Sequence, residues 1–247
     1  RAAHACAHVS SGSATAAGAA FMLTPMVGEA TPILIIDDYS TLQRVDDVTT
    51  APGVNSSTLA DPAVLGGWRD LHVRNTSGAT DVQTTLQSDG NFLDFSNNNF
   101  ATGRGFINYD GSAFNAADPT DVDIDGLGGV NFLIGPNPFF NFDVSSFESN
   151  LDVTIRAWDM DSELTTYFET LPPAGSFSPI LPLKLFDNPL FDWTRVGALQ
   201  FEIESKTVGY DGAISAVSVE AIPLPAPALL MFGGMGALSL LRLRRKG

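Results

Sequence analysis

The sequence predicts an all-β protein, an antiparallel β-sandwich, followed by a C-terminal transmembrane or sorting helix. Three observations lead to this fold class. Short segments rich in β-branched and aromatic residues recur between clusters of Gly, Pro, Asn and Asp. No long helical periodicity interrupts them between residues 31 and 220. An apolar run then fills residues 226–241 and ends in a basic cluster.

Residues 1–30 are predicted to be a signal peptide. Residues 14–27 form a short apolar run without charge, and Gly28 and Ala30 then supply the small side chains that signal-peptidase cleavage before Thr31 needs. The run is too short to cross a bilayer comfortably, which favours a cleaved signal over a permanent anchor. A plain Ala-rich leader is the alternative interpretation.

Residues 31–220 are predicted to form one β-sandwich domain. In chain order, the expected strands are residues 33–36, 68–74, 105–109, 130–134, 151–158, 196–204 and 213–220. The clearest of them alternates strictly, with one set of side chains inward (Leu151, Val153, Ile155, Ala157) and the other outward (Asp152, Thr154, Arg156, Trp158). The strand 196–204 repeats this scheme, with Leu199, Phe201 and Ile203 inward and Gln200, Glu202 and Glu204 outward.

The tail, residues 222–247, has three parts. A Pro-rich motif comprises Pro223, Leu224, Pro225 and Ala226, and an apolar helix is expected over 226–241. Sixteen helical residues span about 24 Å, so the flanking arginines would have to reach the bilayer surface by snorkelling. The basic cluster comprises Arg242, Arg244, Arg245 and Lys246, and it would stay cytoplasmic by the positive-inside rule.

Charge and cysteine content exclude several classes of function. Residues 31–220 hold 8 basic and 27 acidic residues, a net charge of −19, which opposes nucleic-acid binding. The single cysteine, Cys6, lies in the predicted leader, so the body has neither a disulfide nor a thiol nucleophile. His72 is the only histidine after the leader, which leaves a Ser-His-Asp triad little support. The many aspartates make any chosen glycosidase pair non-specific.

A candidate calcium site lies at Asp121, Asp123 and Asp125, followed by Gly126. This spacing matches the first half of a calcium loop, in which carboxylates converge on the ion, but Phe132 stands where the bidentate Glu should be. The alternative is a strand with the three carboxylates in water. Three like charges on one face of a strand repel each other, and a bound Ca²⁺ would relieve that repulsion.

Trp158 is the candidate ligand-binding residue, because its register on the strand 151–158 points it outward. A flat, apolar indole can stack on the face of a sugar ring. Trp68, Trp193 and Tyr109 lie near predicted turns and offer the same chemistry. The alternative is that at least two of the three Trp side chains belong to the core, since sandwich cores commonly bury Trp.

The tail resembles the PEP-CTERM sorting signals of Gram-negative bacteria, in the VPLPA-type variant, with Ile222 where that pattern usually has Val. The Gram-positive sortase signal shares the layout but needs LPxTG, which this tail lacks. The resemblance implies an exosortase-type membrane protease as partner, which removes the tail and passes the protein outward. It also implies an association with exopolysaccharide and biofilm matrix.

The body resembles an uncharacterised group of tail-sorted proteins built on a galactose-binding-like jelly roll. The matching segments are residues 35–40, 65–71, 109–111, 126–131 and 193–203. This resemblance implies a jelly-roll-like sandwich and a surface that binds carbohydrate.

Together these features predict an exported protein of the cell surface or extracellular matrix that binds polysaccharide and is not an enzyme. Its precursor is expected to be tethered in the inner membrane by the C-terminal helix, and the processed protein to reach the cell envelope or the medium. Two alternatives stay open: a secreted glycan-active hydrolase, and a simple C-terminally membrane-anchored envelope protein.

Overall fold

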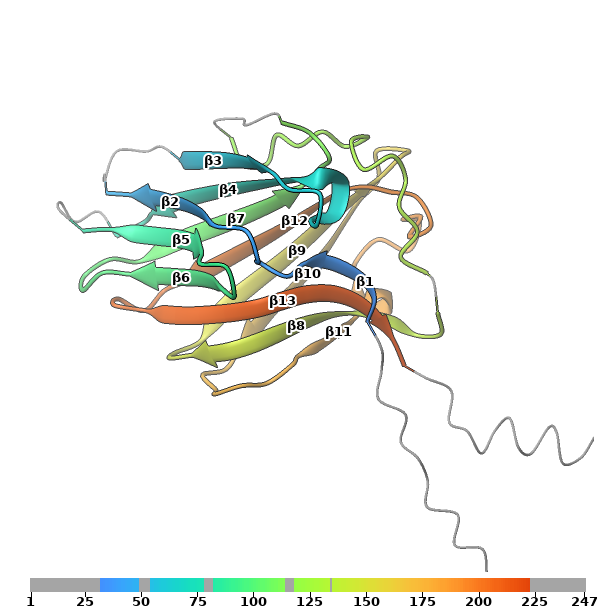
Figure 1. Cartoon of the computed structure of the whole chain (residues 1–247). Coiled ribbons are helices and arrows are strands. Elements are labelled where there is room, and N and C mark those ends of the chain that lie inside the picture. The colour runs from blue at the N-terminus through green and yellow to red at the C-terminus, as the bar shows by residue number, and fades with distance from the viewer. Residues whose placement is uncertain (1–31, 49–53, 78–81, 114–117, 134, 223–247) are drawn as a thin grey trace, which may run out of the picture. The chain divides into compact units, whose positions relative to one another are not determined.

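The computed structural model describes residues 32–48, 54–77, 82–113, 118–133 and 135–222. These residues form thirteen strands and two short 3₁₀ helices, η1 (Leu65–Gly67) and η2 (Leu183–Leu185). All strand pairs are antiparallel and make two sheets that enclose one core (Figure 1). The predicted antiparallel β-sandwich is therefore confirmed. Within the described ranges, no helix has the length and apolar content needed to cross a membrane.

The first sheet has six strands. Their spatial order is β10 (Leu164–Leu171), β9 (Leu151–Asp159), β12 (Val196–Ser205), β7 (Gly103–Tyr109), β4 (Trp68–Asn75) and β3 (Asn55–Ala60). Its register places the even-numbered side chains of neighbouring strands in rows across the face that points away from the core. One such row runs through Asp70, Asn108, Gln200, Arg156 and Thr166.

The second sheet has seven strands. Its path is β11 (Ile180–Pro182), β8 (Pro138–Phe147), β13 (Asp211–Ala221), β6 (Leu93–Asn97), β5 (Thr84–Ser88) and β2 (Gln43–Asp47), and β1 (Pro32–Asp37) also pairs with β13. The long strand β13 thus has β8 on one side, and β6 and β1 in succession on the other. The first and last described strands of the chain are neighbours, as Figure 1 shows.

The core between the sheets is rich in aromatic rings. Phe201 of β12 packs edge-on against Phe140 and Phe142 of β8, with ring centroids 5.8 and 5.2 Å apart. The predicted alternation of β9 is confirmed, because its odd-numbered residues are buried and the even-numbered ones are partly exposed. Edge-to-face ring packing of this kind adds about 0.5–1.5 kcal/mol per pair to the area that the rings bury.

Two segments differ from the expectation. Residues 130–133 make a single bridge, from Val130 to Val196, instead of the predicted strand 130–134. Residues 124–127 form a turn, so the row of aspartates does not lie on a strand. Positive φ angles at Gly128 and Gly129 carry the chain out of this turn, a conformation that glycine adopts without strain.

Candidate functional site

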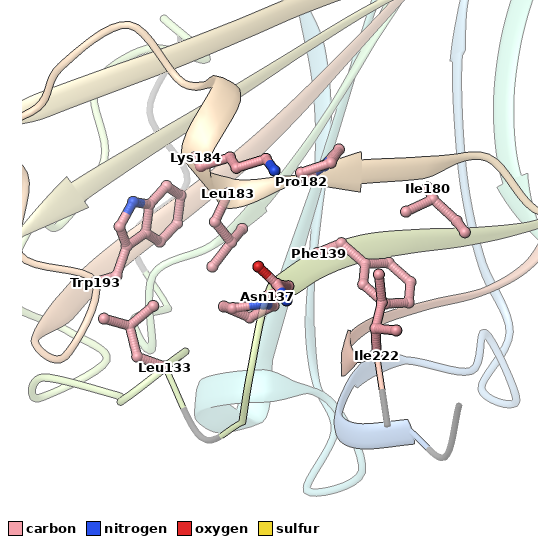
Figure 2. A pocket seen from close by; sticks show the side chains of 10 residues that line it. Leu133, Asn137, Phe139, Ile180, Pro182, Leu183, Lys184, Trp193 and Ile222 are labelled. Carbon is pink, nitrogen blue, oxygen red and sulfur yellow. The ribbon is translucent and has the colours of Figure 1, made fainter. Parts of the chain in front are cut away.

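An apolar pocket of about 510 Å³ opens beside β8 and β11 (Figure 2). Its lining is Leu133, Asn137, Pro138, Phe139, Ile180, Pro182, Leu183, Lys184, Trp193 and Ile222. Among the described lining residues, Lys184 is the only one with a charged side chain, and none is a carboxylate. The pocket can hold an apolar group, but this described lining has no acid–base pair. Trp193 belongs mainly to the core, where it packs on Phe186 and Phe191.

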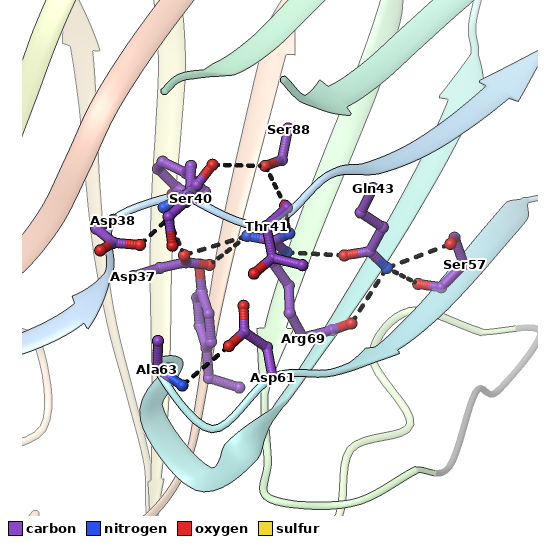
Figure 3. A network of polar contacts seen from close by, with 12 residues as sticks. Asp37, Asp38, Ser40, Thr41, Gln43, Ser57, Asp61, Ala63, Arg69 and Ser88 are labelled. Atoms are coloured by element: carbon purple, nitrogen blue, oxygen red, sulfur yellow. Dashed lines mark hydrogen bonds and ion pairs between the residues drawn. The ribbon is translucent and has the colours of Figure 1, made fainter. Parts of the chain in front are cut away.

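A buried polar network joins the two sheets (Figure 3). Arg69 of β4 and Asp37 of β1 form an ion pair of 2.9 Å, and their side chains are 0% and 1% exposed. Arg69 also donates to Oε1 of Gln43 and to the carbonyl of Thr41, both at 2.7 Å. Burial raises the pKa of Asp37, and the charge of Arg69 opposes that rise. The network cannot reach a ligand, so its role is structural.

The segments 35–40 and 65–71, which carry part of the resemblance to the jelly-roll group, supply the partners of this network. Tyr109, a candidate binding aromatic, is fully buried and donates its hydroxyl to Asp37 at 2.9 Å. Its position beside a predicted turn made a binding role conceivable, but the ring faces the core from the last residue of β7.

The outer face of the six-stranded sheet carries a line of charged groups. Glu202 of β12 lies between two arginines, with Arg156 Nη2 at 2.7 Å and Arg104 Nη1 at 3.2 Å. Arg156 also donates to Oε1 of Gln200 at 2.8 Å, and Arg104 pairs with Glu204 at 3.2 Å. These contacts fix the guanidinium groups before any ligand arrives, which lowers the entropy cost of binding.

One half of this face is covered by the segment around Pro119. Its carbonyl accepts hydrogen bonds from Asn108 and Gln200. His72 and Asp70 therefore lie buried, although their register places them on the outer face of the sheet. Gln200 and Glu202 are buried as well, which corrects the expectation that they lie outside in water. The covering segment is remote in sequence from β12, so the strand pattern could not reveal it.

Burial beneath the Pro119 segment shifts the pKa values of Asp70 and His72. It raises the pKa of Asp70 to about 6, and the nearby charge of Asp110 adds to this rise. It lowers the pKa of His72 to about 4, although Asp118 acts in the opposite direction. Nδ1 of His72 has no hydrogen-bond partner among the described residues. Such a histidine is neutral at pH 7.

The other half of the face is open, and we call it the open strip. It comprises Thr154, Arg156 and Trp158 on β9, and Leu164, Thr166 and Phe168 on β10. Trp158 is half-buried and lies opposite Leu164, whereas Phe168 is 59% exposed and lies opposite Thr154. Four residues therefore separate the two aromatic positions along the strand, a distance of about 13 Å. The predicted outward direction of Trp158 is confirmed.

The candidate calcium ligands lie on the exposed turn. Asp121, Asp123 and Asp125 are all exposed, and the backbone N–H of Asp125 donates to Oδ1 of Asp123 at 3.3 Å. The backbone N–H of Asp123 donates in turn to the buried Asp110 at 3.0 Å. Across the described ranges, no three His, Cys, Asp or Glu side chains gather in a group that could hold a metal ion. Calcium binding at this turn stays a prediction.

The predicted signal peptide, sorting motif, apolar helix and basic cluster lie outside the described residues. These are residues 1–30, Pro223, Leu224, Pro225 and Ala226, residues 226–241, and Arg242, Arg244, Arg245 and Lys246. Within the described part, sequence reasoning did not single out Phe168, Arg104 or Arg74 as site residues. The outward register of Arg156, two residues before Trp158, was the one available signal for a charged site on this face.

The sequence matches no protein-family model and no curated protein. Its structure is similar to the family 11 carbohydrate-binding module of the cellulase Lic26A-Cel5E of Clostridium thermocellum, with 12% identity, a TM-score of 0.32, and 74% of this chain and 96% of that chain covered. It is similar to the family 30 module of the cellulase Cel9D-Cel44B of the same organism, with 11% identity, a TM-score of 0.36, and coverage of 72% and 98%. It is also similar to PfGH50B, with 10% identity and a TM-score of 0.39; the match covers 64% of this chain but only 24% of the length of PfGH50B.

Proposed function

We propose that this chain is an exported bacterial surface or matrix protein that binds polysaccharide on the open strip without cleaving it. The observation that carries the proposal is the placement of Trp158 and Phe168 on one exposed face, with Arg156 between them along β9 and β10. Each aromatic ring offers an apolar surface to a sugar face. The pair is farther apart than the width of one sugar ring, which favours a polymer over a monosaccharide.

The polar groups between the two rings suit hydroxyl recognition. Arg156 is 24% exposed and held by Glu202 and Gln200, so its free N–H groups point from a fixed position. Thr154 and Thr166 lie beside it and add hydroxyl groups that both donate and accept. Ordered donors on a rigid sheet bind with less loss of conformational entropy than donors on a loop.

Non-catalytic binding fits the state of the carboxylates. A glycosidase needs one protonated and one ionised carboxyl group on opposite sides of the scissile bond. Glu202 is buried and both of its oxygens are engaged by arginines, Oε1 by Arg104 and Oε2 by Arg156. Asp70 has the raised pKa of a proton donor but is 1% exposed beneath the Pro119 segment. Release of reducing sugar by the purified chain would instead favour the hydrolase alternative.

Export and sorting form the second part of the proposal. The motif Pro223–Ala226, the apolar run and the basic cluster support processing by an exosortase-type protease, and the acidic body suits a protein that stays soluble outside the cell. Affinity electrophoresis in gels containing one polysaccharide each tests the binding. We expect the chain to be retarded in at least one gel, and Trp158→Ala to abolish the retardation. Unchanged mobility in every gel would refute polysaccharide binding.

A further inference from the structure

Basic residues are scarce in this protein but gather on the outer face of the six-stranded sheet. Of the 8 basic residues in 31–220, four lie there. They are Arg74 on β4, Arg104 on β7, Arg156 on β9, and Lys206 directly after β12, which pairs with Asp152 at 2.6 Å. Carboxylates of the same face pair with three of the four: Glu202 with Arg104 and Arg156, and Asp152 with Lys206. Arg74 is the exception among the described residues.

Arg74 and Arg104 lie directly opposite each other in the antiparallel register of β4 and β7. Like charges at such a position destabilise a sheet unless other groups compensate them. Glu202 and Glu204 compensate Arg104, but Arg74 has no ion pair among the described residues and is exposed. Nε of Arg104 is buried without a hydrogen-bond partner in the described part of the chain. One positive charge and one N–H donor therefore remain unsatisfied at the same place.

We propose that Arg74 and Arg104 bind the anionic group of an acidic polysaccharide, a carboxylate or a sulfate. The guanidinium of Arg74 is free to bind a carboxylate with two parallel N–H donors, the geometry that makes arginine suitable for this group. This inference rests on the proposed polysaccharide binding and specifies the class of polymer.

The site is continuous with the open strip. Arg104 contacts Glu202, and Glu202 contacts Arg156, so a line of ionic contacts crosses from β7 over β12 to β9. In the sheet, β4 and β9 are separated by three strand spacings, a distance of about 14 Å. Arg74 lies in the row of Arg104, Glu204 and Asp152, six residues along β9 from Trp158, which adds about 20 Å in the strand direction. A glycan that stacks on Trp158 must therefore extend obliquely over several sugars to place an acidic sugar over Arg74.

The negative charge of the rest of the body disfavours polyanions of high charge density more than those of moderate charge density. A net charge of −19 in residues 31–220 repels densely charged polymers such as nucleic acids at long range. A polysaccharide with one charge per sugar or fewer feels less of this repulsion, and its short-range contact with the arginines is only partly screened. The favoured ligand is therefore a polysaccharide of moderate charge density.

The test compares the full chain with Arg74→Gln on three probes: polygalacturonate, dextran sulfate and neutral dextran. Arg44→Gln is the matched control, because Arg44 is an exposed arginine on β2 of the other sheet. We expect Arg74→Gln to weaken binding to polygalacturonate about tenfold, the cost of one charge-assisted contact, and Arg44→Gln to leave it unchanged. Equal loss on dextran sulfate would assign the site to anions in general, and a loss restricted to polygalacturonate would assign it to carboxylates.

Two outcomes would overturn the inference in distinguishable ways. If Arg74→Gln binds polygalacturonate like Arg44→Gln while Trp158→Ala still abolishes binding, the arginine pair is not a recognition site but polysaccharide binding stands. If the unmodified chain binds none of a wider panel of acidic and neutral polysaccharides, polysaccharide binding itself is wrong. Circular dichroism of each variant confirms that the fold is unchanged, which is expected because the Arg74 side chain has no ion pair within the described ranges.

Discussion

Tyr109 and Arg69 donate hydrogen bonds to the same oxygen, Oδ2 of Asp37, each at 2.9 Å. Asp37 ends β1 in the seven-stranded sheet, whereas Arg69 and Tyr109 belong to β4 and β7 of the six-stranded sheet. One carboxylate therefore connects the two layers through the core. Because this carboxylate is buried, the loss of any one of its partners should destabilise the folded protein.

Removing one partner of this ion pair should be costly. We expect Arg69→Met to lower the free energy of unfolding by about 3–5 kcal/mol, because Asp37 is left buried and unpaired. Tyr109→Phe should cost about 1.5–3 kcal/mol, the range for a hydrogen bond to a charged group. Urea denaturation measures both, with Arg44→Met as a surface control. A loss below 1 kcal/mol for Arg69→Met would show that Asp37 is neutral or solvated.

The covered pair Asp70 and His72 should give opposing pH dependences. The folded-state pKa of Asp70 is raised to about 6, so its stabilising contribution is present below about pH 4 and is lost as the pH rises to 6. The folded-state pKa of His72 is lowered to about 4, so its contribution is present above about pH 6.5 and is lost as the pH falls to 4. Over this window the two effects oppose each other.

Single substitutions should separate the two effects. We expect Asp70→Asn to make stability fall more steeply on acidification from pH 6.5 to 4, and to raise stability above the wild-type value at pH 8. His72→Gln should instead make the chain lose stability as the pH rises from 4 to 6. Thermal melts at half-unit pH intervals provide the measurement. Parallel pH profiles for the wild type and both variants would mean that neither group is desolvated in the fold.

Polysaccharide affinity should depend on both aromatic residues of the open strip. We expect Trp158→Ala and Phe168→Ala each to weaken binding about tenfold or more, because each removes an aromatic contact at the centre of the site. Leu42→Ala removes an exposed apolar side chain, 68% exposed, from the turn between β1 and β2 and should have no effect. Isothermal titration with the polysaccharide identified in the gels measures the affinities. Equal loss from Leu42→Ala would indicate non-specific apolar adsorption.

Processing of the tail can be measured by mass. We expect the protein recovered from the envelope or medium to lack the residues after about Ala226, and Pro223→Ala with Pro225→Ala to block that cleavage. If the intact mass still includes Arg242 through Lys246, the tail is not cleaved, and the alternative of a simple membrane anchor is favoured.

Calcium binding at Asp121, Asp123 and Asp125 predicts a higher melting temperature in millimolar Ca²⁺, reversed by chelator and reduced by Asp123→Asn. At a hundredfold excess over the dissociation constant, a bound ion adds about 2.7 kcal/mol. A melting temperature that changes with neither Ca²⁺ nor chelator would mean that the three carboxylates are solvated and bind no ion.

The sequence pattern predicted the strands that carry strong alternation or dense apolar character, such as β9, β12 and β13. It missed β2, β3, β5, β6, β8, β10 and β11. Of these, β8 is long and rich in Phe, so its sequence carried a signal that was not used. In contrast, β3, β5 and β6 have the short, polar sequences NSSTLA, TTLQS and LDFSN. Their strand conformation comes from pairing with β4, β2 and β13, which is tertiary context and has no local signal.

The site was predicted only in part, for a similar reason. The outward direction of Trp158 follows from the period of one strand. The opposition of Arg74 and Arg104 depends on the register between two strands, which neither strand encodes alone. The covering of His72 and Gln200 depends on where a loop far along the chain crosses the sheet.

The position of β13 has a mechanical consequence. It is the last described strand of the chain, and it is hydrogen-bonded to β8 on one side and to β6 and β1 on the other. A force applied along the axis of this strand loads the hydrogen bonds of both ladders together. Shear of this kind requires many bonds to break at once, whereas peeling an edge strand breaks them singly. The fold therefore resists a pull applied through β13 by shear and not by peeling.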